Sequence, residues 1–117
     1  MSTFDHPGLM QDINEGLAQF RKAQPDAMQG FAQISRAAMT EGVISSKYKE
    51  LMALVIGVTQ HCSGCIAFHV KALHKLKCTR AELDEMLAVC VFMGGGPALM
   101  YAAEASKAWE TMVPEAG

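Results

Sequence analysis

The sequence predicts an all-α protein, and two observations support this class. Apolar residues recur at intervals of three and four along nearly every segment, as on one face of a helix, and the alternation of period two that marks strands is absent. Half of the 117 residues are apolar and 19% are charged, which is typical of a globular protein. We expect a single domain over residues 1–117, built as a bundle of about six helices.

Two helices are expected within residues 8–40. Pro25 followed by Asp26 suits the start of the second, because proline lacks the N–H that would be unbonded there and aspartate complements the positive helix end. The break between the two helices therefore falls at Gln24 or Pro25. The apolar stripes that define them are Leu9, Ile13, Leu17 and Phe20 on the first, and Met28, Phe31, Ser35 and Ala38 on the second.

A third helix is expected over residues 46–59. It is apolar almost all round after Glu50, so it belongs in the centre of a bundle or of an oligomer. A fourth helix follows and ends near Leu76, with Cys62 at its N-terminal edge because polar and small residues precede it.

A fifth helix is expected from Thr79 to about Met93. Thr79 and Glu82 have the spacing of a capping box, which marks the start of a helix. The uncharged run over residues 86–103 approaches the length of a membrane span, but Gly94-Gly95-Gly96-Pro97 divides it. We therefore expect two buried helices joined by a tight loop, with Pro97 in the first turn of the last helix.

Charge and the N-terminal sequence narrow the possible functions. Ten basic and twelve acidic residues give a net charge of −2, with no basic cluster that would bind a row of phosphates, so nucleic-acid binding is not expected. Residues 1–8 show no pattern of a secretory signal, which predicts a cytoplasmic protein and argues against structural disulfides. No membrane association is expected either.

The chemistry is expected at Cys62-Ser63-Gly64-Cys65. Thiols at the N-terminus of a helix lie in the positive field of the helix dipole, which lowers their pKa and favours the reactive thiolate. At a spacing of three residues the two sulfurs share one helix face and can form a disulfide. This pattern predicts redox chemistry.

His69 and Glu50 complete the candidate site. His69 lies four residues after Cys65, on the same helix face, where it can take or relay a proton. A carboxylate partner would orient its ring and raise its basicity, and Glu50 on the preceding helix is the natural candidate.

The combination of Glu50, Cys62-x-x-Cys65 and His69 at these spacings resembles the signature of the alkylhydroperoxidase AhpD family. That family belongs to the carboxymuconolactone decarboxylase-like superfamily, whose members are all-helical and assemble as trimers or hexamers. The resemblance covers a core at about residues 41–109, with the N-terminal helices over residues 8–40 added to it. It implies an AhpD-like bundle and a homotrimer or homohexamer.

The resemblance also implies roles for the residues. Glu50 would polarise His69, and His69 would deprotonate a cysteine. Cys65 would attack a hydroperoxide and Cys62 would resolve the sulfenic acid into a disulfide, although the reverse assignment is also compatible with the pattern. A lipoyl-bearing or thioredoxin-like dithiol donor would regenerate the pair, and no cofactor or metal is implied. Some members carry a histidine between the two cysteines, where this chain has Ser63-Gly64, and His61 is a candidate for a similar group.

Three other functions fit parts of the pattern. Cys62 and Cys65 could form half of a zinc site completed by His69, Cys78 or Cys90, although neither Cys78 nor Cys90 has a second cysteine nearby. Lactone decarboxylation occurs in the same superfamily, generally in members without the paired cysteines. A non-enzymatic redox-sensing or metal-binding module is the third.

The remaining cysteines and histidines are expected to lie outside the site. Cys90 lies in an apolar run and is expected to be an inert core residue. Cys78 is expected to be a partly exposed thiol, and His74, among three lysines, a solvated side chain.

Overall fold

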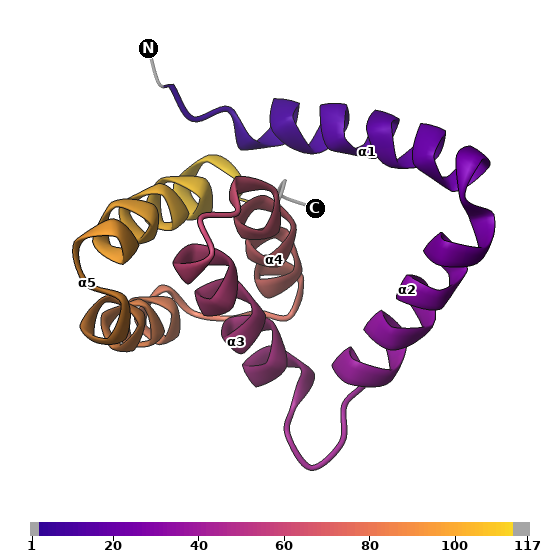
Figure 1. The fold of residues 1–117 in the computed structure, drawn as a ribbon. Helices are drawn as coiled ribbons and strands as arrows, with labels where there is room; N and C mark the ends of the chain where they lie inside the picture. The colour runs from indigo at the N-terminus through magenta and orange to yellow at the C-terminus, as the bar shows by residue number, and fades with distance from the viewer. Residues whose placement is uncertain (1–2, 114–117) are drawn as a thin grey trace.

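A computed structural model describes residues 3–113, which form five helices and no strand. In chain order these are α1 (His6–Ala23), α2 (Pro25–Met39), α3 (Ser46–Thr59), α4 (Ser63–Lys75) and α5 (Arg80–Thr111) (Figure 1). The predicted all-α class is therefore confirmed. The number of helices is close to the expected six, since α5 is a single element that contains a sharp bend.

The bend in α5 lies at Gly95, within the predicted break. Gly95 has φ 74° and ψ −156°, a backbone conformation that a residue with a Cβ rarely adopts. Figure 1 shows the helix turning back sharply there, so that its two halves lie at a steep angle to each other. The break is narrower than expected, because Gly94 and Pro97 remain helical and Pro97 falls in the first turn after the bend.

Helix α5 is, among the described residues, the one helix long and apolar enough by composition to cross a membrane. The bend at Gly95 divides it, and neither straight half has the roughly 20 residues that a span requires. Its side chains instead contribute to the core between α3, α4 and α5.

The hydrophobic core lies between α3, α4 and both halves of α5. Leu54, on α3, is fully buried, as are Ile66 and Val70 on α4. Small residues on the second half of α5 let the helices approach closely. The buried side chains of the cluster are Leu51, Leu54, Val58, Ile66, Val70, Leu73, Cys78, Leu83, Leu87, Cys90, Ala98, Ala102, Ala105 and Ala108.

The two N-terminal helices lie outside this core. Helix α1 packs against α4, whereas α2 mainly contacts α1 and α3 and buries no residue. In Figure 1 the two helices form an open angle, with α1 along the top of the view and α2 along its right side. Phe31, from the apolar stripe expected on α2, is 69% exposed in the single chain, and Ile34 on the same helix is 67% exposed.

The predicted helix starts are confirmed. Pro25 occupies the first turn of α2, and Thr79 caps α5 in a complete capping box with Glu82. Glu82 also forms an ion pair with Lys47, at 2.6 Å, which links the start of α5 to α3. Hydrogen bonds from Lys47 and from the Thr79 backbone lower the pKa of Glu82 from 4.5 to about 2.

Two expectations about side chains outside the site are wrong. Cys78 is buried, because Lys77 adopts a positive φ of 62° and the Cys78 N–H donates to the Leu73 carbonyl, which turns the thiol inward. His74 is not a freely solvated side chain. Its ring packs on Trp109 with centroids 3.8 Å apart, and its Nε2 donates to the Trp109 carbonyl at 3.0 Å.

Candidate active site

The two cysteines occupy the first turn of α4, as predicted. Cys62 is the N-cap residue, and its Sγ accepts a hydrogen bond from the Cys65 N–H at 3.1 Å. The two sulfurs are joined in a disulfide. One sulfur of the disulfide therefore also caps the N-terminus of α4.

Glycines allow the neighbouring helices to approach this turn. A Cβ added to Gly57 of α3 would lie 2.9 Å from the Cβ of Cys65, so α3 passes directly against the cysteine turn. On the other side, a Cβ at Gly64 would lie 2.7 Å from Cδ1 of Ile13, so α1 also packs on the turn. The cysteine turn is thus packed between α1 and α3.

Glu50 and His69 meet, although they come from different helices. The Nδ1 of His69 lies 2.6 Å from Oε2 of Glu50, and both side chains are partly buried. Since an ionised carboxylate only accepts hydrogen bonds, Nδ1 carries the proton and Nε2 is left as the basic atom of the neutral ring. His69 lies one helical turn after Cys65, at the middle of α4, so its ring and the side chain of Cys65 lie on the same face of the helix.

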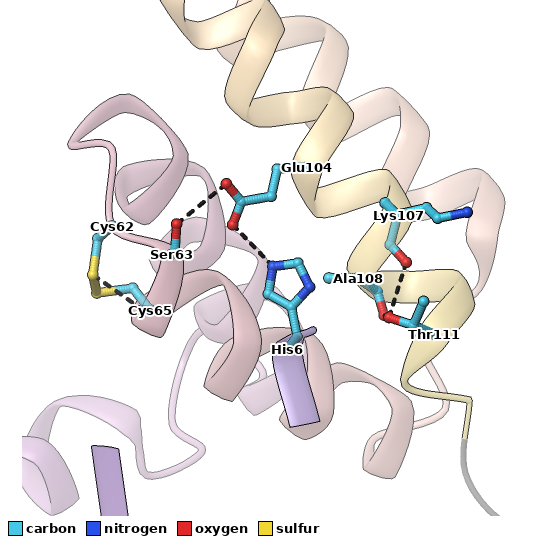
Figure 2. Close-up of polar contacts among 8 residues, drawn as sticks. All are labelled: His6, Cys62, Ser63, Cys65, Glu104, Lys107, Ala108 and Thr111. Atoms are coloured by element: carbon cyan, nitrogen blue, oxygen red, sulfur yellow. Dashed lines mark hydrogen bonds and ion pairs between the residues drawn. A yellow bond between two sulfur atoms is a disulfide. The ribbon is translucent and has the colours of Figure 1, made fainter. Parts of the chain in front are cut away.

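A second polar cluster reaches the same turn from the other side, and the sequence patterns did not reveal it. Glu104, on the second half of α5, accepts a hydrogen bond from the Ser63 hydroxyl at 3.2 Å. Its other oxygen lies 2.9 Å from Nε2 of His6, at the start of α1. Figure 2 shows Glu104 between these two residues, with the disulfide on the far side of the turn. Because 98 positions separate His6 from Glu104, no local spacing could have indicated this contact.

His61 does not take the place of a histidine between the cysteines. Its backbone has φ 58°, and its ring stacks nearly parallel on Tyr101 with centroids 4.5 Å apart. The stack joins the connection before Cys62 to the second half of α5. It adds an exposed aromatic surface beside the cysteine turn.

The other two thiols lie in the core. Burial raises the pKa of both Cys78 and Cys90 above the ordinary thiol value. The Cys90 thiol faces the Val55 carbonyl at 3.6 Å, which confirms the expected core position. Within residues 3–113, no three His, Cys, Asp or Glu side chains are grouped as a metal site would require.

Comparisons with known proteins agree with this fold. The profile of the carboxymuconolactone decarboxylase family matches residues 25–108. The crystal structure of apo-lpg0406, a carboxymuconolactone decarboxylase family protein from Legionella pneumophila, has a TM-score of 0.91 and 46% identity, and the match covers 93% of this chain and 97% of that one.

Two curated relatives match along most of the chain as well. An uncharacterized protein of Cupriavidus necator is 36% identical over 103 residues, which cover 88% of this chain and 91% of that protein. The uncharacterized protein 4 in the cox locus of Paracoccus denitrificans is 24% identical over 96 residues, which cover 82% and 86%. The sequence match and the shared helical fold lead to one conclusion: this chain belongs to the carboxymuconolactone decarboxylase family.

Proposed function

We propose that this protein is a thiol-dependent peroxidase and disulfide oxidoreductase of the alkylhydroperoxidase type, acting in the cytoplasm. The observation that carries the proposal is the 2.6 Å contact between Glu50 and His69, on the helix whose first turn holds the Cys62–Cys65 disulfide. A base oriented by a carboxylate, one helical turn after a pair of cysteines at a helix N-terminus, supplies what thiolate chemistry requires.

The first half of the cycle uses the reduced pair. Nε2 of His69 accepts the thiol proton of Cys65 while Glu50 stabilises the resulting imidazolium. The thiolate attacks the hydroperoxide, the O–O bond breaks, and the returned proton releases an alcohol or water, leaving Cys65 as a sulfenic acid. The Cys62 thiol then attacks the Cys65 sulfur, which forms the disulfide and releases water.

The second half of the cycle restores the thiols. An external dithiol, of the lipoyl or thioredoxin-like class, attacks the disulfide and passes through a mixed disulfide. The donor's two thiols become a disulfide, and their two electrons and two protons reappear on Cys62 and Cys65. Only side chains of this protein and its two substrates take part.

The test is peroxide consumption by the purified protein with dihydrolipoamide as donor and cumene hydroperoxide or hydrogen peroxide as oxidant. We expect Cys65→Ser to abolish turnover, and His69→Asn and Glu50→Gln to lower kcat by roughly 10²–10⁴-fold. Cys90→Ala, which removes a thiol remote from the turn, is the matched control and should retain activity.

The variants also distinguish the competing outcomes. A sulfenic acid that accumulates in Cys62→Ser identifies Cys65 as the attacking residue, and accumulation in Cys65→Ser instead would exchange the two roles. Full peroxide turnover in both single variants would contradict the proposal. So would turnover of a carboxymuconolactone that does not change in Cys62→Ser, if peroxide is not consumed.

A further inference from the structure

The cluster of His6, Glu104 and Ser63 is a built site that the proposed cycle does not use. Three segments distant in the sequence supply it, namely the start of α1, the second half of α5 and the first residue of α4. Ser63 is one of the two residues enclosed by the cysteines. Glu104 therefore hydrogen-bonds to the residue that directly follows Cys62.

Burial shows that this cluster is more than a surface ion pair. His6 is 2% exposed and Glu104 is 7% exposed. A buried carboxylate is costly unless hydrogen bonds replace its hydration, and here the Ser63 hydroxyl donates to one oxygen and His6 Nε2 to the other. The second ring nitrogen of His6 is also buried and has no hydrogen-bond partner within residues 3–113.

The order of contacts separates this cluster from a hydrolase triad. In such a triad the imidazole contacts the hydroxyl and the carboxylate contacts the far side of the imidazole. Here the carboxylate lies in the middle and the hydroxyl donates to it, so the imidazole of His6 contacts Glu104 and not Ser63 Oγ. The arrangement holds a carboxylate in place and does not prepare a nucleophile.

The position of that carboxylate has an electrostatic consequence. The positive N-terminal end of α4 favours a thiolate at Cys62, and a buried negative charge at the next residue opposes it. A less favourable thiolate destabilises the reduced pair relative to the disulfide, which lowers the reduction potential.

We propose that Glu104 is a positioning residue that lowers the reduction potential of the Cys62–Cys65 pair, with Ser63 and His6 holding its carboxylate beside the N-terminus of α4. The proposal rests on the proposed function only in taking this pair as the redox centre. Its test needs no peroxide, so absence of peroxidase activity and absence of this effect are separate results.

The experiment is equilibration of the full chain with glutathione buffers at pH 7, followed by acid quenching, alkylation and mass analysis of the pair. In each equilibration the protein disulfide and two glutathione thiols become two protein thiols and one glutathione disulfide, so electrons and protons balance. Glu104→Gln removes the charge and keeps the shape of the side chain. Its amide oxygen can still accept one of the two hydrogen bonds, and its NH2 group can donate at the other position, to the Ser63 hydroxyl oxygen or to His6 Nε2 in the other tautomer. We expect it to shift the equilibrium constant about tenfold toward the reduced pair, which is about 30 mV for a two-electron couple.

Two further variants distinguish the effect of the Glu104 charge on the reduction potential from the effect of a loosened structure. Glu110→Gln removes an exposed carboxylate from the same helix and should leave the potential unchanged. His6→Gln keeps a donor for Glu104 and leaves its charge in place, so it should not raise the potential. A thermal melt of each variant confirms that it is folded.

The kinetic counterpart is alkylation of the reduced protein with iodoacetamide. Glu104→Gln should label Cys62 faster than the wild type at pH 7, since more of its thiol is ionised. An unchanged potential in folded Glu104→Gln would overturn the proposal. An equal rise in Glu104→Gln and His6→Gln would also overturn it, because loosening of α1 would then account for both.

Discussion

At the scale of single residues, the four cysteines divide into two classes by environment. Cys62 and Cys65 lie at a helix N-terminus, where the backbone favours a thiolate, whereas burial raises the pKa of Cys78 and Cys90. Since the thiolate is the reactive form, position in the fold decides which sulfurs can take part in redox chemistry.

This difference predicts selective labelling. After reduction, iodoacetamide at pH 7 should modify Cys62 and Cys65 in the folded protein, and should modify Cys78 and Cys90 at a comparable rate only in guanidinium chloride. Peptide mass mapping after short exposures measures each site. Rapid labelling of Cys90 in the folded protein would contradict the core position of its thiol.

At the scale of helices, the contact between α3 and α4 depends on the absence of a side chain at Gly57. We expect Gly57→Ala to destabilise the protein by about 1–3 kcal/mol, because its Cβ would overlap the Cβ of Cys65 and separate the two helices. Denaturant unfolding measures the change.

Gly16→Ala is the matched control for this prediction. Gly16 also lies within a helix, but a Cβ there meets no atom within 4 Å. The substitution should therefore stabilise the protein by about 0.4–1 kcal/mol, through helix propensity and reduced entropy of the unfolded chain. Equal effects of the two substitutions would show that the close approach at Gly57 is unimportant.

The link between α3 and the start of α5 should depend on pH. Because the pKa of Glu82 is lowered from 4.5 to about 2, its contribution to stability is complete above pH 4.5 and is lost as the pH falls through 2. We expect Glu82→Gln to lower the Tm at pH 7 modestly, since the pair with Lys47 is exposed to solvent screening.

The same difference in Tm between Glu82→Gln and the wild type should shrink as the pH is lowered from 4.5 to 2. Thermal melts followed by circular dichroism across this range give the comparison. Glu85→Gln, an exposed position on the same helix, should show little difference at any pH. A difference for Glu82→Gln that stays constant down to pH 2 would contradict the assignment.

At the scale of the whole molecule, the uncovered face of α2 predicts self-association. The angle between α1 and α2 leaves Phe31 and Ile34 in solvent, and Ile56 of α3 and Phe92 of α5 are exposed as well. Apolar surface of this extent on a small chain favours burial against another copy.

Light scattering after size exclusion should therefore give a mass that is a multiple of the single chain, as expected for a trimer or hexamer. The double variant Phe31→Ser, Ile34→Ser should lower that mass, whereas Gln33→Ser on the same helix should not. A monodisperse monomer of the wild type at micromolar concentration would contradict the prediction.

Much of the fold follows from local signals in the sequence. Helical periodicity, Pro25 and the Thr79 capping box placed most helix starts, because these features act within one or two turns. The inward turn of Cys78 and the packing of His74 on Trp109 were not foreseen, since both depend on how α4 meets α5.

The residues of the candidate site also fall into two groups, those that local spacing indicates and those that only the folded chain brings together. Spacing along the chain was enough to select Glu50, His69 and the cysteines as one group, and the structure places Glu50 beside His69 and joins the two sulfurs. Spacing along the chain could not select His6 and Glu104, because their contact exists only once α1 and α5 are folded against α4. Long-range polar contacts leave no periodic trace in a sequence.

The cap of α4 has one more consequence. The Cys65 N–H donates to Cys62 Sγ, an atom whose charge and bonding change on every turn of a thiol–disulfide cycle. A thiolate accepts a hydrogen bond more strongly than a disulfide sulfur does. The amide resonance of Cys65 should therefore move downfield on reduction, giving a built-in spectroscopic reporter of the oxidation state without any added label.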